Sequence, residues 1–287
     1  MKILRLDSLG GASGDMLLGV LIGLGAKREE LEAELRSVLP DHFHLTVDEV
    51  TLGGIAGIRA GVDLHDHGDG HDHGQTHGDD QQHGVHAHHH RSMADIRAML
   101  ETSALPDAAK AMAIAIFTML ARAEGRVHGV PAEEVHFHEV GAADSIIDIA
   151  GCALAFHRLG IDAVSLSPLP TGSGTLRCEH GILPIPAPAT AELLKSSGLQ
   201  IAPSLESFEL LTPTGAAVLA AWPKAEIPAG AQITAVVNSF GKRTLRHTPN
   251  LLRAMLFETA AATSETDDEV CRLECEIDDA TGEGLGA

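Results

Sequence analysis

The stretch from His136 to Asp148 reads HFHEVGAADSIID and sets two histidines, a glutamate and two aspartates among mostly apolar residues. If its first residues form a strand, His136 and His138 point to one face and Glu139 to the other, because side chains alternate along a strand. Two imidazoles on one strand face are a common metal chelate, and imidazole suits nickel, zinc and copper. We therefore expect His136, His138 and Glu139 to do catalytic or metal-binding work.

The second half of this stretch predicts a helix with carboxylates on one face. Asp144 stands where an N-cap residue belongs, and Asp144, Asp148 and Cys152 follow one another at four-residue intervals, which a helix places on one side. A carboxylate buried between two isoleucines, as Asp148 would be, is costly unless a metal, a histidine or backbone amides compensate for it. The structural alternative is that Asp144 caps the helix, Asp148 complements the helix dipole and the histidines are packed.

A glycine-rich turn, LGGASGD, lies between a predicted strand and a predicted apolar helix. Glycines let a ligand approach the backbone, and the exposed amides of a helix start attract phosphate. The turn is neither a Walker motif nor a Rossmann fingerprint, because the required spacings are missing. The alternative is an ordinary strand-to-helix turn. The phosphate-binding candidates are Gly10, Gly11, Ser13, Gly14 and Asp15.

Two further segments carry candidates for substrate binding. In the stretch TPTG, Pro213 suits the first position of a helix and Thr212 suits its cap. The stretch GSGTLRCEHG offers Arg177, which either pairs with a phosphate or carboxylate or is a solvated surface arginine. We expect Thr212, Thr214 and Arg177 to contact substrate.

The composition changes abruptly between residues 65 and 90, where ten His, five Asp, five Gly and three Gln fill 26 positions. Such a segment cannot bury enough apolar surface to fold, so we expect a disordered insertion. Its imidazoles favour nickel, zinc, copper and cobalt, and a tethered tract raises the local metal concentration. The expected metal-capturing residues are His65, His67, His71, His73, His77, His83, His86, His88, His89 and His90.

Composition limits the classes of partner and compartment. The 287 residues carry a formal net charge of −20, which repels nucleic acid and anionic membranes. The longest apolar run, residues 16–26, is too short to span a bilayer. The four cysteines form no Cys-x-x-Cys pair and the N-terminus has no signal-peptide layout, so we expect a reduced, cytoplasmic protein.

Strand and helix patterns alternate along the chain and predict an α/β fold, with a mixed α+β arrangement left open. Aromatic residues make up only 3% of the sequence, so the core must be aliphatic. Strands are expected at 2–8, 44–52, 58–64, 233–239, 251–258 and 269–278. Helices are expected at 16–26, 29–38, 92–101, 107–124, 189–195 and just after residue 212, with a turn and a buried helix within 139–160.

Seven motifs occur in the order found in the LarC family: DSLGGASGDM, HHHR, VHFHEVGAADSIIDIAG, SPLPTGSG, CEHGILPIPAPAT, ELLTPTGAA and IDDATGE. The resemblance runs from about residue 1 to the last residue. The family consists of nickel insertion proteins of nickel-pincer cofactor biosynthesis. The resemblance implies an enzyme, a lyase or cyclometallase, that inserts nickel into pyridinium-3,5-bisthiocarboxylic acid mononucleotide and uses CTP with Mn²⁺ or Mg²⁺.

This resemblance gives the candidate residues their expected roles. The substrate phosphate fits the glycine-rich turn, and nickel fits the histidine tract as a feeder. A nickel–carbon bond forms only when a ring proton leaves, so a base is needed; His138 or His136 beside Glu139 is our candidate, with Asp144 and Asp148 orienting them or holding a cation. Two other functions stay open: a nickel store or chaperone without catalysis, and a metal-dependent phosphohydrolase.

Two departures from the family pattern affect these expectations. The family usually continues beyond IDDATGE into a C-terminal domain associated with CTP, so we expect residues 1–260 to form the N-terminal core and 261–287 to form a linker and the start of that domain. The remainder is either cut off or a separate polypeptide partner. The chain has SFGKR where the family has a GYGAG-like turn, although Lys242 and Arg243 could meet a phosphate. An oligomer is expected from the resemblance alone.

We predict that deletion of residues 65–90 leaves nickel insertion intact when nickel is in excess and slows it when nickel is scarce, because the tract only concentrates the metal. The measurement is the insertion rate of both chains as a function of nickel concentration. Loss of turnover in excess nickel would contradict the feeder role, and a pure nickel store would lose its function at every concentration.

Overall fold

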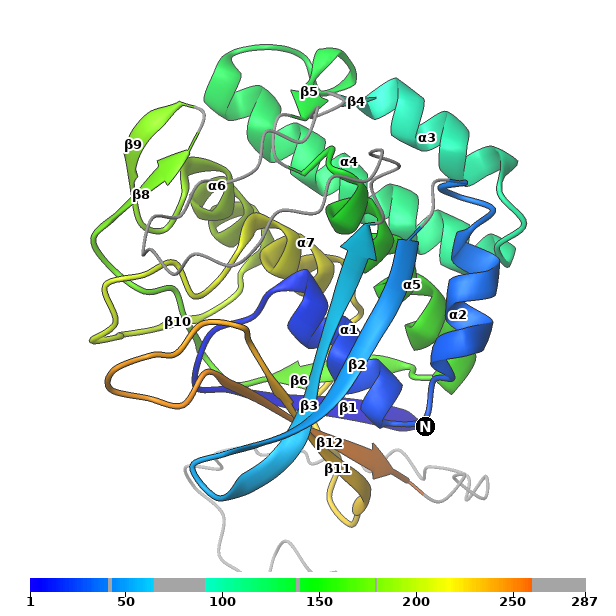
Figure 1. The fold of residues 1–287 in the computed structure, drawn as a ribbon, viewed down its shortest axis with the longest axis vertical. Helices are drawn as coiled ribbons and strands as arrows, with labels where there is room; N and C mark the ends of the chain where they lie inside the picture. Colours follow the sequence, from blue (N-terminus) through cyan, green and yellow to red (C-terminus); the bar gives the residue numbers. More distant parts are fainter. Residues whose placement is uncertain (41–42, 65–90, 138–139, 179, 260–287) are drawn as a thin grey trace, which may run out of the picture.

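A six-stranded mixed sheet forms the base of the molecule in a computed structural model that describes residues 1–40, 43–64, 91–137, 140–178 and 180–259 (Figure 1). The strands lie in the order β2-β3-β11-β12-β1-β6. The pairs β1·β6 and β3·β11 are parallel, and the other neighbours are antiparallel. These strands are β1 (Lys2–Ser8), β2 (Phe43–Leu52), β3 (Ile55–Leu64), β6 (Ala163–Leu166), β11 (Gln232–Phe240) and β12 (Leu251–Glu258).

The helices lie together on one side of this sheet (Figure 1). They are α1 (Gly14–Gly23), α2 (Arg28–Leu35), α3 (Met93–Thr102), α4 (Asp107–His128), α5 (Ala143–Leu159), α6 (Pro188–Ser197) and α7 (Pro213–Ala221), with a 3₁₀ turn at Ala132–Glu134. Helix α1 contacts both the sheet and α5, and α5 and α2 also reach the sheet at β3 and β2. None of the helices in the described ranges is long and apolar enough to cross a membrane.

Three short two-stranded ribbons complete the described part. They pair β4 (Arg91–Ser92) with β5 (His136–Phe137), β7 (Leu169–Pro170) with β10 (Ile201–Ala202), and β8 (Thr175–Cys178) with β9 (Gly181–Pro184). The expected α/β class is confirmed, and its main sheet contains both parallel and antiparallel strand pairs. The strand expected at 269–278 and the histidine tract at 65–90 lie outside the described residues.

Aliphatic side chains fill the space between the sheet and the helices, as the scarcity of aromatics predicts. Leu17 and Leu18 of α1 are fully buried, as is Ile146 of α5, and burial of each side chain contributes about 1.5–3 kcal/mol. The single tryptophan, Trp222, closes the far end of this core by stacking on Phe156 with ring centroids 4.9 Å apart.

The expected cap is wrong for one helix and confirmed for another. Helix α5 has Ala142 as its N-cap, so Asp144 lies in the first turn and not at the cap. Its carboxylate accepts a hydrogen bond from the Ser145 amide at 2.7 Å, which still places negative charge at the positive end of the helix. Thr212 caps α7 as expected, because its hydroxyl accepts from the Gly215 amide at 3.1 Å.

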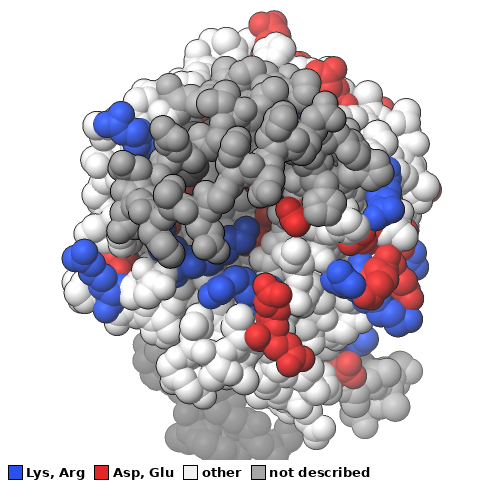
Figure 2. All heavy atoms as spheres, viewed as in Figure 1, with Lys and Arg blue, Asp and Glu red and all other residues white. Residues whose placement is uncertain are grey.

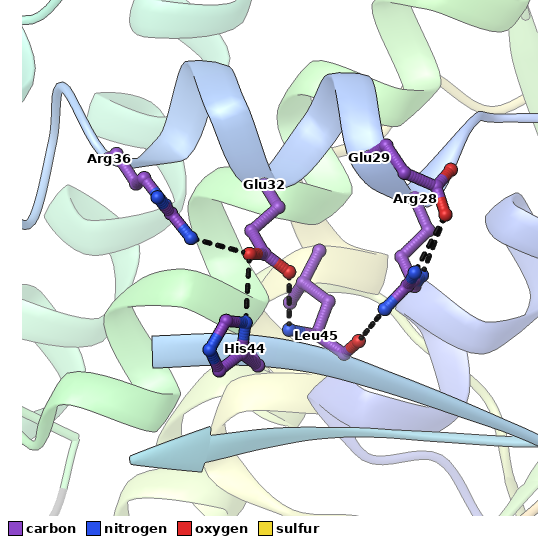
Figure 3. Close-up of polar contacts among 6 residues, drawn as sticks. All are labelled: Arg28, Glu29, Glu32, Arg36, His44 and Leu45. Atoms are coloured by element: carbon purple, nitrogen blue, oxygen red, sulfur yellow. Dashed lines mark hydrogen bonds and ion pairs between the residues drawn. The ribbon is translucent and has the colours of Figure 1, made fainter. Parts of the chain in front are cut away.

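A polar network joins α2 to the edge strand β2 (Figure 3). The Glu32 carboxylate pairs with Arg36 at 2.8 Å, contacts His44 at 3.1 Å and accepts from the Leu45 amide at 3.0 Å. Arg28 donates to the Leu45 carbonyl at 3.1 Å. Burial alone would raise the pKa of Glu32, but the bonds from Leu45, Arg36 and His44 outweigh it and lower that pKa.

We predict that Glu32→Gln lowers the free energy of unfolding by about 1 kcal/mol at neutral pH, because charge-assisted hydrogen bonds are lost. The wild-type contribution is complete above the ordinary glutamate pKa and disappears as the pH falls through the lowered one, so the two proteins should converge in acid. Urea unfolding at several pH values measures this. The matched control is Glu29→Gln, which removes an exposed partner of Arg28 and should change nothing measurable; an equal effect of both variants would contradict the prediction.

Candidate functional site

The glycine-rich turn after β1 runs beside the segment that precedes α7. The Ala12 amide donates to the Leu210 carbonyl at 3.0 Å, and the Thr212 amide donates to the Ala12 carbonyl at 3.1 Å. Gly11 has a φ of +83°, and a Cβ at this position would overlap the Leu210 carbonyl. Two segments that the sequence places about 200 residues apart therefore form one backbone contact that only glycine permits.

The same contact brings two helix starts together. A Cβ at Gly215, in the first turn of α7, would collide with the Ala12 carbonyl. Helix α7 therefore begins directly against the turn that leads into α1. The positive dipole ends of two helices favour a negatively charged ligand here.

A third segment, the loop between β11 and β12, completes a pocket of about 200 Å³, which we call the glycine-loop pocket. Its lining includes Gly10, Ser13 and Asp15 from the first segment, Thr212 from the second, and Lys242 and Arg243 from the third. The Lys242 ammonium lies 3.9 Å from the Asp15 carboxylate. Basic side chains gather near the middle of the face in Figure 2, in the area where Figure 1 draws the start of α1.

A buried glutamate fixes the shape of this third segment. Glu206 is only 1% exposed, and its carboxylate accepts from the amides of Arg246, His247 and Thr248 at 3.1, 2.6 and 3.1 Å. Burial acts to raise the pKa of Glu206, but these amide bonds outweigh it and lower that pKa. Glu206 thus holds the loop that carries Lys242 through backbone amides, and neither Lys242 nor Arg243 serves as its partner.

Asp148 lies directly beneath the start of α1. A Cβ on Gly14 would approach its Oδ2 to 2.7 Å, so glycine is needed for this contact. Its Oδ1 is buried without a hydrogen-bond partner. Burial raises the pKa of Asp148 well above its ordinary value, the charges of Asp15 and Asp144 add to this rise, and Lys242 opposes it. Asp148 therefore holds a proton at higher pH than an exposed aspartate does.

Cys152 lies on the same face of α5, one turn beyond Asp148. Its thiol lies 3.7 Å from the Gly14 carbonyl and is buried. Burial raises the pKa of this thiol, and the negative charges of Asp148 and Asp15 raise it further. The helical spacing of Asp148 and Cys152 thus brings both to the glycine-rich turn, and the thiol stays protonated.

The remaining candidates lie elsewhere or are not described. His136 is exposed on β5, and its charge helps to lower the pKa of Asp95. Arg177 is exposed on β8 and does not line the glycine-loop pocket. Thr214 contacts Thr212 through their hydroxyls at 2.9 Å. His138 and Glu139 lie outside the described residues, so the expected chelate with His136 is not placed.

Two further observations bear on the candidate site. Within the described ranges, no group of three or more His, Cys, Asp or Glu side chains is arranged to hold a metal ion. Sequence reasoning also missed Glu206, because one glutamate in ESFEL carries no signal that it will meet three amides some 40 residues later. The sequence does offer a signal for Lys242 and Arg243, namely two positive charges directly after a glycine. This signal is too weak to place them among the expected site residues.

Comparison with known proteins places the chain in a family. A family model described as "Nickel insertion protein" matches residues 4–287. The pyridinium-3,5-bisthiocarboxylic acid mononucleotide nickel insertion protein of Akkermansia muciniphila is 45% identical over 289 residues, which cover 99% of this chain and 66% of that relative. Proteins of the same name from Geobacillus kaustophilus and Staphylococcus epidermidis are 39% and 40% identical, over 100% and 99% of this chain and 69% and 66% of the relatives.

The chain spans about two thirds of the length of these curated relatives. No solved structure matches it. Because the family model covers nearly the whole chain and the relatives align along its full length, the chain belongs to the nickel insertion protein family.

Proposed function

We propose that this chain takes part in the insertion of nickel into pyridinium-3,5-bisthiocarboxylic acid mononucleotide and that the glycine-loop pocket binds the phosphate of that substrate. The observation that supports this most directly is the convergence of three separate segments on one pocket. We take the reaction from the relatives that are named for this activity. Nickel is the metal delivered, and the mononucleotide receives it.

The pocket offers the groups that a phosphate monoester needs. The positive ends of the α1 and α7 helix dipoles favour an anion, and Lys242 and Arg243 contribute positive charge. Arg243 is held over the Phe208 ring at 4.7 Å, which restricts its motion. Asp15 would repel a phosphate, so we place the phosphate towards Gly10, Ser13 and the two cations, with Asp15 facing the rest of the substrate.

The reaction also requires a proton acceptor, because the ring carbon gives up a proton and directs its electron pair to nickel. We propose that Asp15, at the wall of the pocket, and Asp148, beneath it, receive and hold this proton. The raised pKa of Asp148 makes its carboxylate a better proton acceptor than an exposed aspartate. The base expected from the sequence, His138 beside Glu139 and His136, is the competing assignment.

CTP and Mn²⁺ or Mg²⁺ remain proposed requirements of the complete reaction, together with the lyase-type cyclometallase chemistry, an oligomeric state and a cytoplasmic location. The described residues provide no ready three-ligand site for Mn²⁺ or Mg²⁺. We therefore assign no residue of the glycine-loop pocket to either ion. Reactions run with and without the additional polypeptide found in the longer relatives would show where CTP acts.

Two other functions are distinguished by simple assays. A nickel store would bind the metal and release it unchanged to a partner, without altering the mononucleotide. A metal-dependent phosphohydrolase would cleave generic phosphate esters and would depend on His136 and His138. The glycine-loop pocket favours insertion over storage, because a store needs no phosphate site.

We predict that Lys242→Ala weakens binding of the bisthiocarboxylate mononucleotide about tenfold to hundredfold, since one charge-assisted contact to phosphate is lost. Isothermal titration of the mononucleotide measures this without requiring turnover. The control is Lys195→Ala, which removes an exposed lysine paired with Glu192 on α6 and should leave affinity unchanged. Equal affinity of the Lys242 variant and the wild type would show that the phosphate does not bind in this pocket.

We predict that Asp148→Asn stabilises the protein and impairs insertion. A carboxyl whose pKa is raised by folding destabilises the native state progressively as the pH rises from the unfolded pKa to the folded one, so the gain in thermal midpoint should be larger at pH 8 than at pH 5. The insertion rate should fall, because the proton-holding group is lost.

The exposed Asp48 of β2 provides the matched control, since Asp48→Asn should change neither property strongly. His138→Ala is tested in the same assay. If His138→Ala abolishes insertion while Asp148→Asn leaves it normal, the base is the histidine and our assignment is wrong.

A further inference from the structure

A second pocket lies between the end of α4 and the β8–β9 ribbon, and we call it the histidine pocket. It is lined by Glu124 and His128 from α4 and by Cys178 and His180 from the ribbon, with Leu176 and Leu183 among its apolar walls. Its volume is about 50 Å³, which suits an ion and not a large ligand. The sequence analysis assigned none of these side chains a role.

The polar side chains of this pocket come as two ligand pairs on rigid supports. Glu124 and His128 are one turn apart on α4, with the carboxylate 3.4 Å from Nε2 of the imidazole. Cys178 pairs with Gly181 across the ribbon, so His180 lies in the turn between them. Gly181 has a φ of +95°, which allows this tight reversal. A helix turn and a hairpin thus present the two pairs to each other.

The two imidazoles already lie side by side. The ring centroids of His128 and His180 are 4.9 Å apart, with a tilt of 53° between the ring planes. This contact joins residues 52 positions apart in the sequence, so it is made by the packing of the ribbon against α4. Cys178 and Leu176 line the pocket while Arg177 between them is exposed, because side chains alternate along β8.

We propose that the histidine pocket binds one borderline or soft divalent ion, such as Ni²⁺, Co²⁺ or Zn²⁺, through Cys178, His128 and His180, with Glu124 as a further ligand or as the group that orients His128. Thiolate and imidazole are the donors that select such ions, whereas Mg²⁺ and Ca²⁺ prefer oxygen. On binding, the Cys178 thiol releases its proton to solvent and its sulfur electron pair goes to the metal.

Side-chain rotation must complete the site. Among the described residues no three such groups yet converge on one point, and His128 is instead paired with Glu124. This pairing satisfies the imidazole in the metal-free protein. We propose that rotation about the side-chain bonds of Cys178 and the two histidines brings the groups together on binding.

The histidine pocket is adjacent to the candidate substrate site. Pro213, the first residue of α7, is part of its wall, and the preceding residue, Thr212, lines the glycine-loop pocket. Neighbouring residues of one helix start therefore line the two pockets. The metal-binding inference does not depend on the proposed function, and it is tested without any nucleotide.

The experiment uses the chain in which the ten histidines of residues 65–90 are replaced by serine, so that the tract contributes no background. The metal-free protein is titrated with Co²⁺ and followed by absorption spectroscopy, and Ni²⁺ affinity is obtained by competition with a chelator. We expect one tightly bound ion per chain, with a thiolate-to-metal charge-transfer band.

The variants of this chain identify the ligands. Cys178→Ser should abolish the charge-transfer band, and His128→Asn or His180→Asn should each weaken Ni²⁺ binding at least tenfold. The control His157→Asn removes an exposed histidine of α5 and should change neither readout. Circular dichroism confirms folding, and His128→Gln serves if His128→Asn unfolds. No bound ion, or binding unaffected by Cys178→Ser and the histidine variants, would overturn the proposal.

Discussion

The backbone contact between Ala12 and residues 210–212 is the constraint on which the rest of the site depends. It holds the turn before α1 against the segment before α7, and two glycines remove the side chains that would prevent it. An added methyl group at Gly11 or Gly215 would meet a backbone carbonyl, which cannot move aside without disturbing a helix start. The glycine-loop pocket therefore depends on the close approach of two backbone segments.

Acidic and basic side chains are balanced around the glycine-loop pocket, whereas the chain as a whole carries 40 acidic and 20 basic residues. Lys242 and Arg243 line the pocket together with Asp15 and Glu209. The loop that bears the two basic residues is anchored by Glu206 through backbone amides. Because the anchor uses amides and not side-chain cations, Lys242 and Arg243 are left to face the pocket.

Asp148 carries a cost to stability beside the glycine-rich turn. A carboxyl with a buried, unpartnered oxygen destabilises a fold, and ordinary packing would replace it by an apolar side chain. This cost accords with the proton-handling role that we propose for Asp148. The network around Glu32 is the contrast, because both oxygens of this carboxylate have partners and the network joins α2 to β2.

The sequence by itself determined the element types, the mixed α/β class, the cap at Thr212, the helical face shared by Asp148 and Cys152, and the family. The structural features follow from local chemistry, because periodicity and glycine and proline positions act over a few residues, and the family follows from the order of the motifs along the chain. Only the tertiary structure decided which loops share a pocket, that Glu206 meets three amides, that His136 is exposed beside Asp95, and that His128 meets His180. Such contacts join residues tens to hundreds of positions apart, and the packing of the helices and the sheet selects them through the combined shape of many side chains, which no short stretch of sequence contains.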